Sequence, residues 1–156
     1  MKKNIFILIV LSIIISSCGS SGDNSNVAKT SDSTKVIKAV FDIPALVGLN
    51  IDEIKKILGK PTKDDEPTKL QLRNGDVEWD KEFTKDGYTV LVTYDAKTRN
   101  VIDLFIPTKD PSGKTKDYSD LLKIGNLVET DEHYTIKPVS TAIDNESYTG
   151  IKIIKK

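Results

Sequence analysis

A short apolar run near the amino terminus ends at the only cysteine of the chain, and this feature constrains the fold most. Ile5 to Ile15 is apolar except for Ser12, and it follows Lys2 and Lys3. A bilayer span takes about 20 apolar residues, so the run has the length of a cleaved secretory leader. With Cys18 as the sole thiol, no disulfide can form within the chain. The exported part must therefore fold around an apolar core of its own.

The leader closes with Ile15, Ser16, Ser17 and Cys18. An aliphatic residue, two small residues and a cysteine directly behind an apolar run resemble a lipobox, the processing signal of bacterial lipoproteins. This resemblance implies cleavage before Cys18, diacylglycerol on its sulfur and often a further acyl chain, such as palmitate, on the new amino group. Two or more acyl chains anchor a protein stably, because each buried methylene contributes about 0.8 kcal/mol. The alternative is an ordinary secretory signal with a stray cysteine.

We expect three segments: a signal peptide at 1–17, a lipidated flexible tether at 18–35, and an α+β domain at 36–156. The tether is rich in serine, asparagine and aspartate, and as a flexible coil it would hold the domain roughly 25 Å from the lipid. A sub-boundary near 107–116, where Pro and Gly cluster, stays open. Lipoproteins without aspartate after the lipidated cysteine tend toward the outer membrane in diderm cells. Gly19 therefore implies the cell envelope, and the outer membrane if the organism is diderm.

The clearest local signal is a helix over 51–58. Asn50 and Glu53 have the spacing of a capping box, and apolar residues then recur at helical intervals. Gly59 and Pro61 predict the end of this helix. A second short helix is expected at 118–124, followed by Gly125.

Alternating apolar and polar residues predict an antiparallel meander. Glu78, Asp80 and Glu82 share one face of a strand whose other face carries Trp79 and Phe83. The expected fold class is α+β, with one or two short helices packed on the sheet. Strands are expected around Leu70 and Leu72 and at 77–83, 88–94, 101–106, 134–139 and 148–154, with a tight turn at 86–87, whereas 36–41 is an edge strand or the exit of the tether.

Helix, glycine, acidic loop and strand occur in this order twice, which raises the alternative of a tandem helix-plus-strands repeat. Placing Gly59 over Gly125 also places Leu70 over Ile136. The pattern leaves open whether the last 40 residues complete the first sheet or form a second one.

Residues 46–106 resemble a small lipoprotein domain, SmpA/OmlA, of the outer-membrane barrel-assembly machine, and the related repeats of secreted β-lactamase inhibitors. The resemblance lies in the Leu46–Leu49 segment, the isoleucine-rich helix, the Gly-Lys-Pro turn at 59–61, the strand with Trp79, and the Tyr94–Lys97 turn. It implies an α+β layer and a protein-binding role without chemistry. The first of two helices usual in the assembly-machine protein is missing, and about 50 residues follow the matched part.

Candidates for chemistry are few. His133 is the only histidine and is expected at the surface, so a metal site or a catalytic triad lacks partners. The acidic run at 64–66 lacks the spacing of a calcium loop and is expected to be a solvated loop. Serines at 119, 140 and 147 lack a nucleophile-elbow context. The sequence therefore predicts no enzyme, metal site or small-molecule cofactor, although a carboxylate pair of an envelope enzyme stays an alternative.

These features predict a membrane-anchored lipoprotein of the bacterial cell envelope that serves as a non-catalytic protein-binding module in envelope assembly or maintenance. Its expected partners are the membrane, through the anchor, and an envelope protein. The mature chain carries a net charge of about −2 once Lys2 and Lys3 are removed, which disfavours nucleic acid. The alternative is a secreted or anchored enzyme inhibitor or immunity-type protein, which would need a protruding loop such as 108–116.

Overall fold

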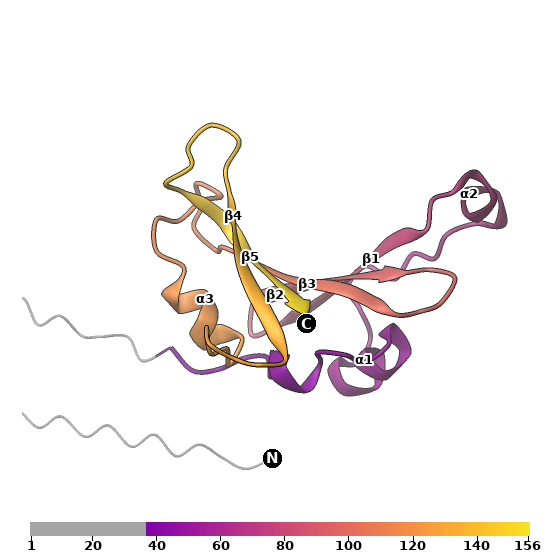
Figure 1. The fold of residues 1–156 in the computed structure, drawn as a ribbon, viewed down its shortest axis with the longest axis horizontal. Coiled ribbons are helices and arrows are strands. Elements are labelled where there is room, and N and C mark those ends of the chain that lie inside the picture. The colour runs from indigo at the N-terminus through magenta and orange to yellow at the C-terminus, as the bar shows by residue number, and fades with distance from the viewer. Residues whose placement is uncertain (1–36) are drawn as a thin grey trace, which may run out of the picture. The chain divides into compact units, whose positions relative to one another are not determined.

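A computed structural model describes residues 37–156 as three short α-helices and one five-stranded sheet, in line with the expected α+β class. Figure 1 shows the arrangement. Within this range no helix is long and apolar enough to cross a membrane. The elements are η1 (Ile43–Ala45), α1 (Ile51–Leu58), α2 (Lys69–Asn74), β1 (Glu78–Lys85), β2 (Tyr88–Asp95), β3 (Val101–Pro107), α3 (Ser119–Ile124), β4 (Tyr134–Ser140) and β5 (Tyr148–Lys155).

The predicted capping box of α1 is confirmed. The Asn50 side chain accepts hydrogen bonds from the backbone N–H groups of Asp52 and Glu53, and the Glu53 carboxylate accepts one from the Asn50 N–H. Gly59 ends the helix with a φ of 86°, a value that favours glycine. Ile51 and Ile54 are fully buried, so the helix packs its isoleucine stripe against the sheet.

All neighbouring strands are antiparallel, in the order β1-β2-β3-β5-β4. The β1–β2 turn has Asp86 and Gly87 at φ values of 50° and 71°, as a tight two-residue hairpin requires. The last strand, β5, lies between β3 and β4. The C-terminal residues therefore complete the first sheet, and no second sheet forms in the described part of the chain.

The expected tandem repeat is not confirmed. Leu70 lies in α2 and Ile136 in β4, so the two positions that the alignment pairs have different structures. The strand expected around Leu70 and Leu72 is wrong. Thr68 and Gln71 form a capping box, and Gly75 ends the segment in the left-handed conformation, so local hydrogen bonds favour a helical turn over an extended strand.

Residues 37–41, which follow the predicted tether, form no strand. The backbone N–H groups of Val40 and Phe41 both donate to the carbonyl oxygen of Ile124, so the chain enters the domain along α3 instead. Phe41 and Ile43 are buried there and extend the core beyond the helices.

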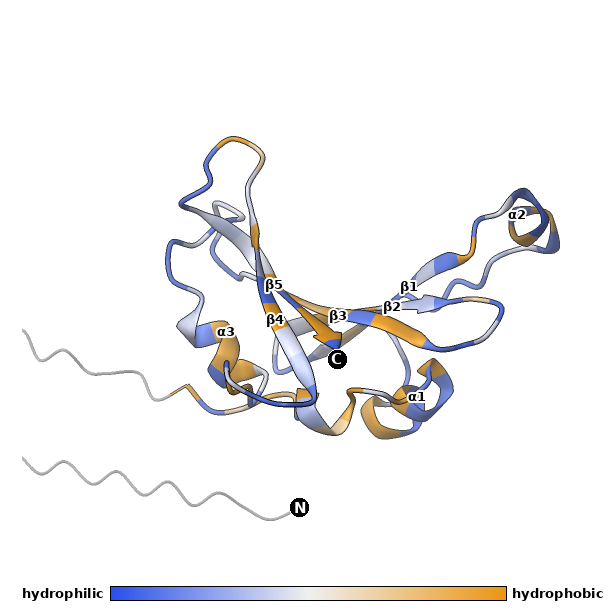
Figure 2. Cartoon of the chain, viewed as in Figure 1, coloured by the Kyte–Doolittle hydropathy of each residue, from blue (hydrophilic) through white to orange (hydrophobic). Residues whose placement is uncertain are grey.

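The core lies between the sheet and the helices. Buried aliphatic and aromatic side chains of β2, β3 and β5 face η1, α1 and α3, and Figure 2 shows apolar residues gathered on these elements. In Figure 1, α1 and α3 lie on one side of the sheet, and no helix of the described range covers the middle of the other side. The core residues are Phe41, Ile43, Leu46, Ile51, Ile54, Phe83, Val90, Val92, Tyr94, Leu104, Ile106, Leu121, Ile124, Leu127, Tyr134, Ile151 and Ile153.

Candidate interaction surface

The predicted lipidation site lies outside the described residues. Ile15, Ser16, Ser17 and Cys18 precede residue 37, where the description of the structure begins. Lipidation of Cys18 and cleavage before it therefore stay predictions.

The acidic run at 64–66 contacts the ammonium group of a buried lysine, Lys81. The Lys81 side chain is 0% exposed, and its Nζ lies 2.9 Å from Asp64 Oδ1, 3.0 Å from Glu66 Oε1 and 2.7 Å from the carbonyl oxygen of Asp65. Three acceptors therefore surround the ammonium group, as a buried charge requires. The indole Nε1 of Trp79 donates to the same Asp65 oxygen at 2.7 Å. The run is therefore an exposed loop, as expected, in which the carboxylates of Asp64 and Glu66 bond cations of the chain.

Two further cations extend this ionic cluster. Arg99 joins Glu66 and Asp52 at 2.9 and 2.7 Å, and Lys55 joins Asp64 at 2.9 Å. Hydrogen bonds from Lys81 and Lys55 lower the pKa of the Asp64 carboxyl to about 2. Burial, together with the bond to Glu66, raises the pKa of Tyr94. Every charge has a partner of opposite sign, so the ionic cluster orders the 64–66 segment and offers no free reactive group.

The histidine and two of the three serines each bond a different aspartate, whereas Ser140 lies exposed in β4. His133 is at the surface, as expected, with 86% of its side chain exposed and its Nδ1 3.1 Å from Asp131. The Ser119 hydroxyl donates to Asp117 at 3.0 Å, and the Ser147 hydroxyl donates to Asp144 at 2.6 Å. Among residues 37–156, no three histidine, cysteine or acidic side chains gather as a metal site.

One cavity of about 270 Å³ lies between α3 and the β1–β2 turn. Tyr88, Leu121 and Ile124 contribute apolar walls, and Asp110, Asp117 and Asp120 contribute carboxylates. Lys109 places its ammonium 3.9 Å from the Tyr88 ring centroid, so a cation of the chain already occupies the aromatic face. The volume lies just below the usual range of small-molecule pockets, about 300–1,000 Å³.

The uncovered side of the sheet carries apolar side chains outside the core and a buried carboxylate oxygen without a hydrogen-bond donor. Because successive strand residues point to opposite faces, the register assigns one set of side chains to it. We call this set the open face. It includes Glu78, Asp80, Glu82, Thr84, Thr89, Leu91, Thr93, Asp95, Asp103, Phe105, Thr135, Lys137, Val139, Gly150, Lys152 and Ile154.

Four apolar side chains lie in the open face. Leu91, Phe105, Val139 and Ile154 are all half-buried, and none of them packs against the core. Leu91 lies opposite Phe105 in the β2–β3 register. A Cβ at Gly150 would meet the Phe105 ring at 2.5 Å, so the ring lies across the backbone of the neighbouring strand. Leu91 and Phe105 are thus adjacent apolar positions on a solvated sheet face, which makes the open face the candidate interaction surface.

Asp103 is the least satisfied polar group of the open face. Its side chain is only 9% exposed, and Oδ2 accepts a hydrogen bond from Lys152 Nζ at 2.8 Å. Oδ1 is buried and has no hydrogen-bond partner. An unpaired buried acceptor is unfavourable by about 1–3 kcal/mol. This strain on the open face contrasts with the satisfied ionic cluster around Lys81.

The loop between β4 and β5 presents a fully exposed aliphatic side chain. Ile143 is 99% exposed. Asp144 accepts hydrogen bonds from the Glu146 N–H and the Ser147 hydroxyl, and Thr141 accepts one from the Asp144 N–H. The loop at 141–147 is therefore preorganised by its own side chains. The loop at 108–116, which the sequence favoured, is instead joined to β5, because the Thr115 and Tyr148 backbone N–H groups each donate to the other residue's carbonyl oxygen.

Sequence reasoning missed the open face, although a signal was present. β2 carries apolar residues at both Val90 and Leu91, and β3 at both Leu104 and Phe105. Such continuous apolar runs are typical of strands with two apolar faces. The helices predicted from the sequence suffice to cover one face only.

Comparison of the chain with known proteins finds no matching family model, no matching curated protein and no matching solved structure.

Proposed function

We propose that this protein is a lipid-anchored, non-catalytic protein-binding module of the bacterial cell envelope, attached through Cys18. The observation that carries the binding role is the open face, where Leu91, Phe105 and Ile154 remain half-exposed on a sheet whose other face is covered. A sheet face of this composition gains free energy when a second protein covers it. The SmpA/OmlA resemblance of residues 46–106 supports the same role in envelope assembly or maintenance.

The anchor is tested by mass spectrometry of the protein from membranes. We expect the first 17 residues to be absent and Cys18 to carry acyl chains. Cys18→Ala should leave the protein unprocessed or released from the membrane, whereas Ser21→Ala is the matched control and should behave as wild type. A Cys18→Ala variant that is still processed and membrane-bound contradicts the anchor.

The binding role is tested in intact cells with a photoreactive amino acid. Thr89 lies on the open face, whereas Lys56 is exposed on α1, on the covered side of the sheet. We expect a protein adduct from position 89 and none from position 56. An adduct from position 56 alone contradicts binding through the open face, and no adduct from either position contradicts the binding role.

The second candidate is an anchored inhibitor or immunity-type protein. The observation that favours it is the preorganised loop at 141–147 with Ile143 fully exposed, because rigid loops lose little entropy on binding. A single soluble enzyme, recovered as the adduct from position 143 and inhibited by the purified protein, distinguishes this function from envelope assembly. The tandem repeat also stays a proposal, since α1 precedes three strands and α3 precedes two strands of one sheet.

A further inference from the structure

Asp103 lies in the open face and lacks one hydrogen-bond donor, which a partner could supply. Asp103 lies opposite Thr93 in the β2–β3 register and shares its face with Phe105, two residues further along β3. One carboxylate oxygen is paired with Lys152, and the other is buried without a donor. A partner that brings a donor to this oxygen removes an unfavourable term that the free protein carries. Asp103 is therefore a buried and only partly bonded carboxylate beside the apolar Phe105 of the open face.

The open face carries more negative than positive side chains. β1 contributes three carboxylates to the open face, and Asp95 and Asp103 add two more. Lys137 and Lys152 contribute two ammonium groups. The open face therefore has a net negative charge. A negative face repels an anionic lipid headgroup and also repels the same face of a second copy of this chain.

We propose that the open face receives a protein with a basic, partly apolar surface, and that an arginine of this partner donates to Asp103 while its guanidinium stacks on Phe105. The inference rests on the proposed binding role. Guanidinium is the group that both bonds a carboxylate with a planar pair of donors and stacks on an aromatic ring. The Lys152 side chain is 40% exposed, so water can hydrate its ammonium group when the Asp103 carboxylate turns toward this second cation.

The test adds a second change to the photocrosslinking variant at position 89. Asp103→Asn keeps the shape of the side chain and removes its charge, and we expect the adduct to fall about tenfold, which corresponds to about 1.4 kcal/mol. Asp120→Asn is the matched control, because Asp120 also pairs with a lysine, Lys123 at 3.0 Å, but lies on α3. The control should leave the adduct unchanged. Circular dichroism of the purified full chain checks that both variants fold.

The partner side of the contact is identified from the same adduct. Mass spectrometry of the cross-linked peptide should place it beside an arginine of the partner. Changing that arginine to glutamine should reduce the adduct as much as Asp103→Asn does, and combining both changes should add little, as expected for directly paired groups.

Failure of this inference differs from failure of the binding role. A protein adduct that Asp103→Asn leaves unchanged overturns the arginine contact while the binding role stands. An adduct that contains lipid, or a second copy of this chain, overturns the proposed occupant. The absence of any adduct from positions 89 and 56 contradicts the binding role itself.

Discussion

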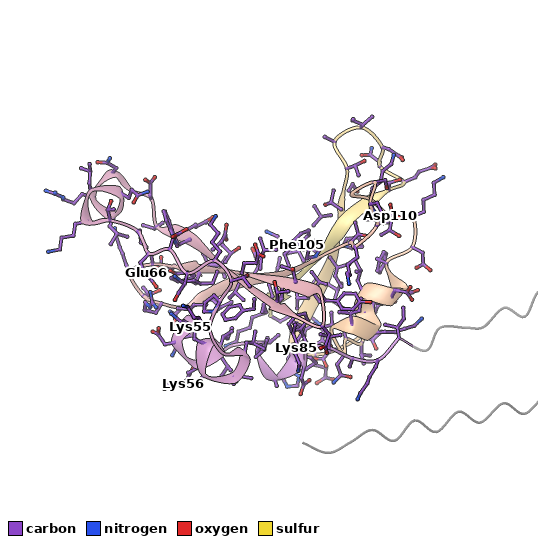
Figure 3. All side chains as sticks on the ribbon, turned by 180° about the vertical axis from the view of Figure 1, so that it is seen from behind. Lys55, Lys56, Glu66, Lys85, Phe105 and Asp110 are labelled. Carbon is purple, nitrogen blue, oxygen red and sulfur yellow. The ribbon has the colours of Figure 1, made fainter. Side chains whose placement is uncertain are left out.

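The two faces of the sheet each bury a charged side chain, but they differ in how completely that charge is hydrogen-bonded. On the covered face, the ammonium group of Lys81 is fully buried and has three oxygen acceptors within 3.0 Å. On the open face, the carboxylate of Asp103 is nearly as buried, but one of its oxygens has no donor. Figure 3 labels Phe105 on β3 and Glu66 of the ionic cluster in the loop between α1 and α2, well apart in the view.

Under the proposed function, this difference assigns the covered face to stability and the open face to partner binding. A buried ion that is fully paired orders the segment around it, here the 64–66 run over β1. A buried ion that is half paired adds little to stability and leaves a polar group ready for a partner. The apolar residues follow the same division, because those of the covered face form the core, whereas Leu91, Phe105 and Ile154 pack against no helix.

The largest effect should come from the core side of β3. Leu104→Ala should lower the free energy of unfolding by about 3 kcal/mol, because the Leu104 side chain is enclosed by the core. Its neighbour Phe105 points to the open face, and Phe105→Ala should cost about 1 kcal/mol despite the larger side chain. Urea unfolding of both variants measures the two losses. Equal losses would contradict the assignment of the two faces.

The ionic cluster around Lys81 should give the next effect. The double change Asp64→Asn and Glu66→Gln leaves the buried ammonium without a carboxylate, and we expect a loss of about 2 kcal/mol. Glu78→Gln with Asp80→Asn removes the same charge from the exposed face of β1 and should change stability by less than about 0.5 kcal/mol. If the two pairs behave alike, Lys81 is not held by its carboxylates.

The same cluster should make stability depend on pH in the acid range. The pKa of Asp64 is lowered to about 2 by Lys81 and Lys55, and hydrogen bonds from Arg99 lower the pKa of Asp52. A carboxyl with a lowered pKa in the folded state stabilises the protein above its unfolded pKa, near 4, and loses this contribution as the pH falls toward 2. Urea midpoints should therefore be level from about pH 7 to 5 and fall between about pH 4 and 2. Trp79 fluorescence is a suitable signal, because Trp79 bonds Asp65 within the cluster.

Lys81→Met tests the origin of this pH dependence. The variant lacks the main donor to Asp64, so its midpoint should change less between pH 4 and 2 than that of the wild type. An unchanged slope in Lys81→Met would show that other carboxyl groups account for the acid sensitivity.

The sequence predicted those elements well that depend on interactions between neighbouring residues. The capping box of Asn50 and Glu53 and the turn at Asp86 and Gly87 depend on residues within four positions of each other. The helix at 69–74 was missed for a related reason. Two leucines at alternate positions suggested a strand, whereas the capping residues Thr68 and Gln71 decide the conformation.

Long-range pairing could not be read from the sequence. Lys81 meets Asp64 and Glu66 only because the 62–66 segment returns along β1, which brings Lys63 opposite Glu82. Asp103 meets Lys152 only because β5 pairs with β3 instead of with a second sheet. Alternation along a strand identifies two faces but does not say which one a helix will cover.

The smallest expected effect distinguishes the two faces most sharply. Asp103→Asn should change the free energy of unfolding by less than about 0.5 kcal/mol, because it removes a buried charge of which one oxygen has no donor, and Lys152 can be hydrated once released. Lys152→Met should cost more, about 1–2 kcal/mol, because it leaves the Asp103 carboxylate buried without any cation. Thermal and urea unfolding measure both. Equal losses would mean that Asp103 serves the fold in the way Lys81 does, whereas a stable Asp103→Asn variant that binds poorly assigns this carboxylate to recognition.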